Sequence, residues 1–250
     1  MGHLFRSLFI GFMLLAAISS LSAASLSAGN ILTKADSAVN APADMYARAT
    51  MILSDANANE NRREMELYQK GDKKRLVRFL SPADQRGVGF LSLPNDVKYL
   101  HLPAFRKTRR IASHIENQSF AGTDFSYDDL SAFNYSEEYE PELVEMTVKY
   151  YILRLSPKPG NEKEYQKLKV WVRTDNYYPE KIEMYDQSGE LRKILEQHKL
   201  IQKNGYWIAS MIRMVNVQEQ HSTILNLSDI ELNTGLSDDI FTRRFLMRVR

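Results

Sequence analysis

The residues of this chain that could do chemistry gather in two short segments of opposite charge. The acidic segment, "AGTDFSYDDL" (121–130), places three aspartates beside two aromatic residues: Asp124, Asp128, Asp129, Phe125 and Tyr127. The basic segment, "FRKTRRIA" (105–112), lies just upstream. Paired carboxylates can act as general acid and base, and clustered aspartates can bind calcium.

Neither a catalytic nor a metal site finds support in the neighbouring sequence. Asp124 and Asp128 are four residues apart and would share one face of a helix, but the nearest histidine, His114, is ten residues away. The chain has no serine-hydrolase, zinc-protease or phosphate-loop motif. A calcium loop of the EF-hand type alternates its ligands and closes with a glutamate, and "DFSYDD" does neither. We therefore expect no catalytic residue, no metal and no cofactor, and we expect that the protein is not an enzyme.

The basic segment has three possible roles. It could be a solvated loop, a rim that meets anionic lipid headgroups, or one half of a latch that pairs with the aspartates downstream. Exposed ion pairs contribute only about 0–1 kcal/mol each, so such a latch could break when a ligand arrives. The residues of the predicted latch are Arg106, Arg109, Arg110, Asp124, Phe125, Tyr127 and Asp128.

The N-terminus resembles a secretory signal. An apolar run from Leu8 to Ile18 follows Arg6, and Ser22 and Ala24 fit the −3 and −1 positions of a signal-peptidase site. The run is shorter than the roughly 20 apolar residues of a transmembrane helix. We predict a signal peptide over residues 1–24, one domain over residues 25–250, and a location in the periplasm.

Composition narrows the class of protein further. The chain has no cysteine, so burial rather than disulfides must stabilise it, and it is long enough for a sizeable core. Its 33 basic and 31 acidic residues leave a net charge of +2. Nucleic-acid binding needs a clear basic excess, so we expect no nucleic-acid partner, and we expect a monomer.

Hydrophobic residues after residue 44 mostly alternate with polar ones, which is typical of β-strands. Short turn sequences such as "KGDK", "DQSG" and "KNG" separate the runs, which favours an antiparallel meander. A sheet of that size curls or closes. We predict a mainly β protein with a single curved antiparallel sheet that forms an unclosed barrel of about eleven strands. The strand-sized runs are 44–57, 60–70, 73–80, 86–93, 96–102, 146–156, 165–174, 179–186, 190–202, 206–219 and 222–233.

Three segments favour short helices that could pack on this sheet. Residues 29–40 and 123–133 carry apolar side chains at helical spacing, and the tail offers Ser237 as an N-cap. The helices at 29–40 and 123–133 would form a lid that competes with a ligand for the inside of the barrel.

Several strands are apolar on both faces, which a sheet with one wet face should not be. Tyr150 and Ile152 alternate with Tyr151 and Leu153, for example. The second apolar face must meet another layer or line a cavity. The candidate lining residues, whose inward or outward direction the sequence leaves open, are Met51, Leu53, Phe79, Phe90, Leu91, Tyr99, Leu100, Trp171, Trp207, Met211 and Leu225.

Several strings together resemble the LolA-like outer-membrane lipoprotein-sorting proteins, in a branch often associated with RND-type exporters. They are "RFLSPADQRGVGFLSL" (78–93), "YLHLPAFRKTRRI" (99–111), "FAGTDFSYDDL" (120–130), "YYPEKIEMYDQSGELRK" (177–193) and "DDIFTRRFL" (238–246). The resemblance implies an unclosed antiparallel barrel, lidded by short helices, that carries acyl chains through the periplasm.

The function expected from these observations is a periplasmic carrier that binds acyl chains of lipoproteins or lipids and shuttles them toward the outer membrane. Its partners would be an inner-membrane transporter of ABC or RND type and an outer-membrane acceptor. Two alternatives remain open. One is a non-catalytic periplasmic partner of an RND-type lipid exporter or an outer-membrane assembly factor. The other is a lipid- or cell-wall-acting hydrolase that uses Asp124 and Asp128.

Overall fold

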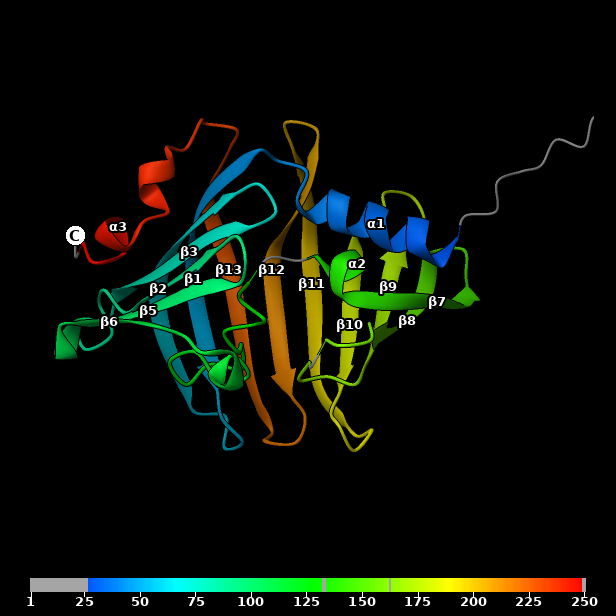
Figure 1. The fold of residues 1–250 in the computed structure, drawn as a ribbon, viewed down its shortest axis with the longest axis horizontal. Helices are drawn as coiled ribbons and strands as arrows, with labels where there is room; N and C mark the ends of the chain where they lie inside the picture. The colour runs from blue at the N-terminus through cyan, green and yellow to red at the C-terminus, as the bar shows by residue number, and fades with distance from the viewer. Residues whose placement is uncertain (1–26, 132–133, 162, 249–250) are drawn as a thin grey trace, which may run out of the picture.

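A single antiparallel sheet organises the protein. The computed structural model describes residues 27–131, 134–161 and 163–248, and within them thirteen strands follow one another in the order β6-β5-β4-β3-β2-β1-β13-β12-β11-β10-β9-β8-β7. The sheet curves round one face and stays open, because β6 and β7 are its two edges (Figure 1). The strands are β1 (Asp44–Ser54), β2 (Glu60–Lys70), β3 (Lys74–Ser81), β4 (Gly89–Leu93), β5 (Val97–Leu102), β6 (Lys107–Arg110), β7 (Tyr139–Met146), β8 (Tyr150–Pro157), β9 (Lys167–Arg173), β10 (Pro179–Tyr185), β11 (Leu191–Lys203), β12 (Tyr206–Asn216) and β13 (His221–Leu232).

The prediction of one unclosed antiparallel sheet is confirmed, but it missed two strands. Both are the edges: β6 reads "KTRR" and β7 reads "YEPELVEM". Most of their side chains are exposed, so neither strand needs the apolar alternation on which the prediction relied. Charged residues and proline are typical of edge strands, and they concealed these two.

The predicted helix over 29–40 is confirmed as α1 (Ala28–Val39). Ser27 caps it, since its side chain accepts a hydrogen bond of 3.2 Å from the backbone N–H of Asn30. Its buried apolar residues are Ile31, Leu32 and Ala35. They join the core on the concave face of the sheet, and the helix lies across one end of that face (Figure 1).

The predicted helix over 123–133 is wrong for the residues that the structure describes, since 123–131 form turns; residues 132 and 133 lie outside the described part. The segment keeps a helix-like hydrogen bond, from the N–H of Leu130 to the carbonyl oxygen of Ser126 (3.2 Å). Ser126 N–H donates to Asp129 Oδ2 (2.8 Å), and Asp129 N–H donates to Ser126 Oγ (3.0 Å). This reciprocal pair has the geometry of a capping box, a pattern that begins helices, but the turns that follow do not extend into a helix over the described residues. The short helix α2 (Tyr135–Glu138) follows.

The tail forms two short helical turns instead of one helix. The 3₁₀ turn η3 (Asp238–Ile240) starts at Ser237, as predicted, and α3 (Arg243–Leu246) has its own N-cap, Thr242. α3 packs with Leu76 and Leu91 on the convex face, opposite the main core. Below it the buried Arg78 pairs with Glu66 and donates to the carbonyl of Phe245 (2.9 Å).

No helix of the described residues is long and apolar enough to cross a membrane. The predicted signal peptide over residues 1–24 lies outside the described residues. Two further 3₁₀ turns, η1 (Pro103–Phe105) and η2 (Ser113–Ile115), flank β6.

Candidate functional site

A segment of the chain itself fills part of the concave face. Residues 111–131, which we call the plug, belong to the same buried apolar cluster as the inner side chains of the strands. The ring of Phe120 stacks on Phe79 with centroids 5.4 Å apart and also lies 6.2 Å from Phe90. Tyr127 lies 5.9 Å from Phe90. The inside of the sheet is therefore covered by a plug rather than by a second sheet.

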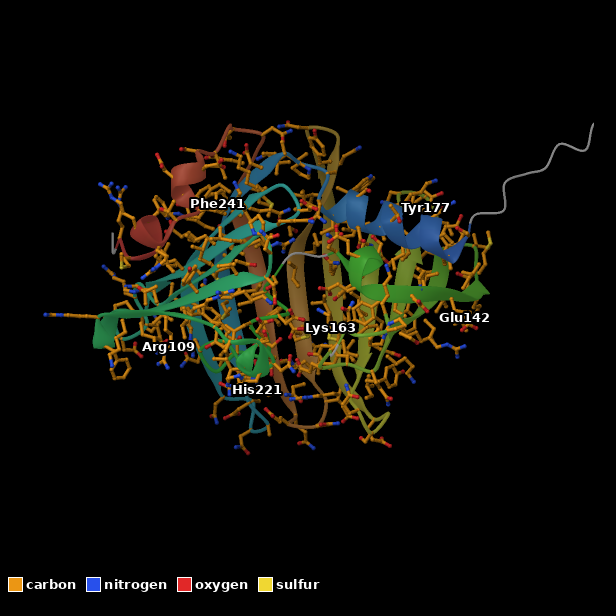
Figure 2. The ribbon with its side chains drawn as sticks, viewed as in Figure 1. Arg109, Glu142, Lys163, Tyr177, His221 and Phe241 are labelled. Atoms are coloured by element: carbon orange, nitrogen blue, oxygen red, sulfur yellow. The ribbon has the colours of Figure 1, made fainter. Side chains whose placement is uncertain are left out.

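Asp124 anchors the plug to β13. Its backbone N–H donates to Thr223 Oγ1 (3.0 Å), and that hydroxyl donates back to Asp124 Oδ2 (2.6 Å). His221 Nδ1 lies 2.8 Å from the same carboxylate oxygen. Figure 2 shows His221 at the end of the molecule where the plug lies. This carboxylate therefore holds a loop in place.

Asp128 and Asp129 anchor the plug at two other places. Asp129 Oδ2 lies 3.0 Å from the Nζ of Lys193 on β11, and both side chains are about 5% exposed. Asp128 lies 3.2 Å from Lys98 on β5 and 3.7 Å from Lys163. Lys98 also pairs with Asp96 and with Glu116 of the plug. Burial opposes its charge, but these carboxylates prevail and raise the pKa of Lys98.

The three aspartates therefore contact different strands, and Asp124 and Asp128 do not share partners. In the described part of the chain, none of Arg106, Arg109 and Arg110 forms an ion pair, so the pairing predicted for the latch is not formed. Asp128 and Asp129 pair instead with Lys98 and Lys193, which lie on the inward side of the sheet and are almost fully buried. Asp124 contacts Thr223 and His221. The lysine partners of Asp128 and Asp129 on the sheet therefore come from β5 and β11 and not from the segment 105–112.

An apolar pocket of about 280 Å³ opens at the rim of the plug. Its walls come from β5, β6 and Val88, the residue before β4, on one side and from the plug on the other. Burial raises the pKa of Tyr127, and the nearby Arg109 opposes that effect. The lining residues are Val88, Leu100, Leu102, Arg109, Ile111, Ile115, Gln118, Ala121 and Tyr127.

Arg63 ties this rim to the sheet. It lies on the inward side of β2, across from Met51, and its Nη1 donates to the carbonyl oxygen of Ala121 (2.7 Å). Its guanidinium carbon lies 5.3 Å from the centre of the Phe79 ring. A cation, an aromatic ring and a plug carbonyl thus meet beside the pocket.

The predicted lining residues fall on both faces of the sheet. Six of them belong to the core of the concave face: Met51, Leu53, Phe79, Phe90, Leu100 and Leu225. Leu91 and Tyr99 lie on the convex face with α3. The half-buried Trp171, Trp207 and Met211 alternate with inward residues such as Val170 and Met214, so they face the convex side too. Alternation alone could not say which side was the inside, and these five residues do not face the predicted cavity.

The sequence analysis did not identify the residues of the sheet that hold the plug aspartates. Lys98 shares its face with Leu100, and Lys193 shares its face with Leu195. A lysine on an otherwise apolar face is the signal that could have identified them. No comparable signal marks His221 and Thr223, whose role depends on the path of the plug.

α1 covers the other end of the concave face through mostly apolar contacts. Asp36 joins it to α2, because its carboxylate accepts hydrogen bonds from the backbone N–H groups of Tyr135 (3.1 Å) and Ser136 (2.8 Å). Burial raises the pKa of Asp36. Lys34 Nζ donates to the hydroxyl of Tyr177 (3.3 Å), which Figure 2 shows beside α1.

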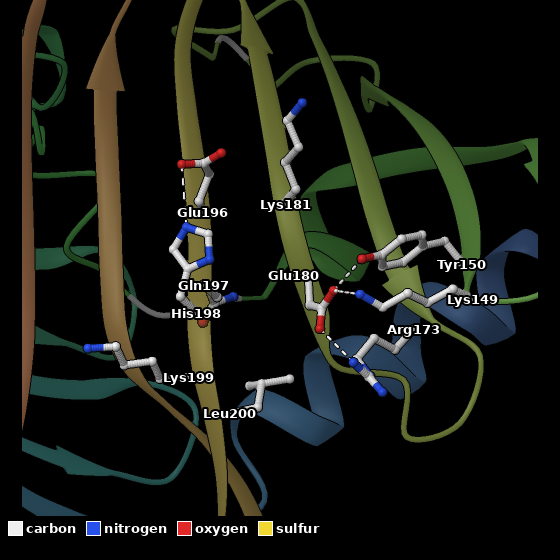
Figure 3. Close-up of a pocket in the computed structure, with 10 residues that line it drawn as sticks. All are labelled: Lys149, Tyr150, Arg173, Glu180, Lys181, Glu196, Gln197, His198, Lys199 and Leu200. Atoms are coloured by element: carbon white, nitrogen blue, oxygen red, sulfur yellow. Dashed lines mark hydrogen bonds and ion pairs between the residues drawn. The ribbon is translucent and has the colours of Figure 1, made fainter.

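A second, larger pocket of about 540 Å³ lies on the convex face (Figure 3). Glu180 is central to it: Arg173 and Lys149 lie 2.6 and 3.0 Å from its carboxylate, and the hydroxyl of Tyr150 donates to it as well. These partners lower the pKa of Glu180 against the effect of its burial. The charge of Glu180 is already satisfied by these partners, and nearly all of the lining side chains are charged or polar, so the pocket is a poor site for an acyl chain.

No group of His, Cys, Asp or Glu in the described part of the chain has an arrangement that could hold a metal ion. What the site offers is apolar surface, aromatic rings and buried ion pairs.

Fold and site together define a class: an open, curved antiparallel sheet with an apolar interior that is covered by separate short segments of the same chain. A family model described only as an uncharacterized protein matches residues 71–248. No match is found among curated proteins.

Solved structures identify the family. A domain from Vibrio parahaemolyticus that carries the name outer membrane lipoprotein-sorting protein is 32% identical, with a TM-score of 0.82, over 88% of this chain and 98% of that one. A DUF1329 family protein from Desulfovibrio piger is 26% identical, with a TM-score of 0.82, over 88% and 97%. A LolA superfamily protein from Nitrosomonas europaea is 24% identical, with a TM-score of 0.73, over 88% and 99%, and shows the same fold. The chain belongs to the LolA-like outer-membrane lipoprotein-sorting protein family.

Proposed function

We propose that the protein is a periplasmic carrier that binds acyl chains of lipoproteins or lipids on the concave face of its sheet and shuttles them toward the outer membrane. It acts by binding and release, without catalysis. The sequence of the signal region and the name of the Vibrio relative support this location and role.

The observation that carries this proposal is the way in which the concave face is covered. A buried CH₂ group contributes about 0.8 kcal/mol, so an acyl chain of a dozen carbons needs apolar surface worth about 10 kcal/mol to leave a membrane. The rings of Phe79 and Phe90 offer such surface, and the ring of Phe120 occupies it in this state. An acyl chain that displaces Phe120 would contact a preformed apolar surface.

Release follows from the same competition. The plug can return to the sheet because Asp124, Asp128 and Asp129 have fixed partners there. A ligand shifts the equilibrium between the covered and uncovered states only by its differential affinity for them. The free energy gained when the plug packs on the sheet is therefore subtracted from the carrier's affinity for the acyl chain. An acceptor needs a binding free energy for the chain that exceeds only this reduced value.

The proposed partners are an inner-membrane transporter of ABC or RND type as donor and an outer-membrane acceptor. One observation also favours the second candidate, a non-catalytic partner of an exporter or assembly factor. The hairpin that joins β7 and β8 exposes apolar side chains, with Val148 99% and Met146 67% exposed. Exposed apolar patches are typical of surfaces that bind proteins or membranes.

The test combines native lipids with a matched pair of variants. Lipids extracted from the purified protein are identified by mass spectrometry, and uptake of a fluorescent fatty acid is titrated. Leu102→Arg places a charge in the pocket at the plug rim, whereas Val148→Arg places the same charge on the exposed hairpin between β7 and β8, where Val148 is 99% exposed. We expect the first variant to lose about tenfold in affinity, equivalent to about 1.4 kcal/mol, and the second to bind as the parent does. A lipid-free protein that takes up no fatty acid would refute the carrier.

A further inference from the structure

The inside of the sheet contains cations with and without carboxylate partners. Lys98 and Lys193 are paired with the plug. Arg75 is different. It lies on the same face of β3 as Val77 and Phe79, two members of the main core, but close to the C-terminal end of α1.

The contacts of Arg75 leave most of its hydrogen-bonding capacity unused. Its Nη2 donates to Asn40 Oδ1 at 3.4 Å, a long bond, and Gln69 Nε2 donates to the same oxygen at 3.3 Å. Its Nε atom is buried and has no hydrogen-bond partner among the described residues. No described carboxylate forms an ion pair with it.

The neighbours of Arg75 do not supply the missing charge. Tyr178 is close enough to act on it electrostatically, but the hydroxyl of Tyr178 donates to Gln197 Oε1 (3.2 Å) and accepts from the backbone N–H of Ala209 (3.2 Å). Burial lowers the pKa of Arg75 to about 10, which still leaves it protonated at neutral pH. The residue as a whole is half-buried, but its Nε is shut off from solvent. A cation that is partly withdrawn from water and has no counter-charge is unfavourable, so the position favours an anion.

We propose that Arg75 binds the negatively charged headgroup, a carboxylate or phosphate, of an acyl lipid whose chain runs along the concave face past Val77 and Phe79. The inference rests on the proposed carrier function and adds the class of its cargo. A guanidinium matches a carboxylate or phosphate with two parallel hydrogen bonds, and Nε is one of the donors that such a fork uses. Phe79 is four residues further along β3, roughly 13 Å at about 3.3 Å per residue, so head and chain fall on one line.

Arg63 does not compete for this role. Its Nε is also buried without a partner, but its Nη1 is engaged with the plug carbonyl of Ala121 at 2.7 Å. Its position belongs to the closing of the plug, whereas Arg75 contacts no plug residue through any hydrogen bond in the described structure.

The experiment compares charged and neutral ligands of one chain length by calorimetric titration. The probes are oleate, methyl oleate and, as a free anion without a chain, acetate. The proteins are the parent, Arg75→Gln and Arg62→Gln; Arg62 is an arginine on neighbouring β2 whose side chain is 69% exposed. We expect the parent to bind oleate about tenfold more tightly than methyl oleate. Arg75→Gln should lose that preference while its affinity for methyl oleate stays unchanged, and Arg62→Gln should behave as the parent.

The headgroup site and the carrier function can fail separately in this experiment. Equal affinity of the parent for oleate and methyl oleate would overturn the headgroup site and leave the carrier standing, whereas binding of neither would overturn both. Binding of acetate as tight as that of oleate would show a simple anion site, which also contradicts a lipid site. A measurement on the parent alone makes the test independent of variant folding: carbon-13 NMR of carboxyl-labelled oleate should show a bound carboxyl pKa below that of the free acid, and an unchanged pKa would contradict the proposal.

Discussion

The plug and α1 both cover the concave face, but different interactions hold them there. The plug places three aspartates against buried cations and hydroxyls of β5, β11 and β13. α1 contributes Ile31, Leu32 and Ala35 to the core, and its polar links run through Asp36 to α2 and through Lys34 to Tyr177. A few directional contacts therefore fix the plug, whereas continuous apolar contact holds α1.

This difference assigns the two covers different tasks. Directional contacts re-form in one geometry only, so they return a displaced segment to the same place. Apolar contact is tolerant of sliding, and an acyl chain can replace it at little cost. We therefore expect the plug to set the closed state and α1 to adjust to whatever lies below it.

The largest expected effect comes from breaking one plug anchor from the sheet side. Lys193→Met leaves Asp129 buried without its cation, and loss of one partner of a buried pair costs about 3–5 kcal/mol. Urea unfolding should show this loss, and Asp129→Asn added to Lys193→Met should restore much of it. Arg154→Met, at an exposed pair with Glu142, should cost less than about 1 kcal/mol. Equal losses for the buried and the exposed pair would contradict the anchor.

A disulfide between the plug and the sheet tests whether the plug must move away from the sheet before a ligand can bind. The chain has no cysteine, so Asp124→Cys with Thr223→Cys offers one disulfide between the plug and β13, at a contact of 3.0 Å from N to Oγ1. If the lock lowers the open population about 100-fold, apparent affinity for a fatty acid falls about 100-fold. Reduction should restore uptake, and each single variant should bind with or without reductant alike. Undiminished uptake by the oxidised protein would show that the plug stays in place during binding.

Weakening α1 should move stability and affinity in opposite directions. Leu32 is fully buried, and Leu32→Ala should lower the free energy of unfolding by about 2 kcal/mol, the lower end for such changes. A looser cover competes less with ligand, so fatty-acid affinity should rise several-fold. Thr33→Ala, on the exposed side of the same helix, is the matched control. A fall in affinity would mean that α1 contacts the ligand rather than excluding it.

Much of the sheet was predictable, because its interior strands alternate and their turns carry Gly, Asn and Asp. The edges β6 and β7 were not, since an edge strand is free to be charged on both faces. The helix at 29–40 was also predictable from the helical spacing of its apolar residues. The prediction for 123–133 failed because contacts with distant strands, such as those of Asp124 with Thr223, fix the path of the chain there.

Only part of the candidate site could be predicted from the sequence. The aspartates of the plug were found, but their partners Lys98 and Lys193 were not, because a pairing across 30 or 64 residues depends on which strands become neighbours. The direction of each strand face was equally hidden. Phe79 and Leu91 look alike in the sequence, yet one meets the plug and the other meets α3.

The smallest expected effect is a difference in pH dependence between two carboxylates near the α1 end. Burial raises the pKa of Asp36. For Asp44, backbone N–H groups of Thr234, Gly235 and Leu236 outweigh burial and lower the pKa. A raised pKa in the folded state means that the folded protein binds the proton more tightly than the unfolded one. Asp36 should therefore add stability as pH falls through its raised pKa, whereas the contribution of Asp44 is present above its unfolded pKa, near 3.9, and is lost as pH falls below it.

Urea unfolding of Asp36→Asn and Asp44→Asn between neutral pH and pH 3 separates the two. Relative to the parent, Asp36→Asn should become progressively less stable as pH falls, because it lacks the gain on protonation. The deficit of Asp44→Asn should shrink over the acidic part of the range, because the parent loses its charged hydrogen bonds there. Slopes of the same sign would show that the link between α1 and α2 is not governed by a buried charge. Opposite signs for the two pH slopes would mean that mild acid strengthens the contact of α1 with α2. The same acid would weaken the contact of Asp44 with residues 234–236.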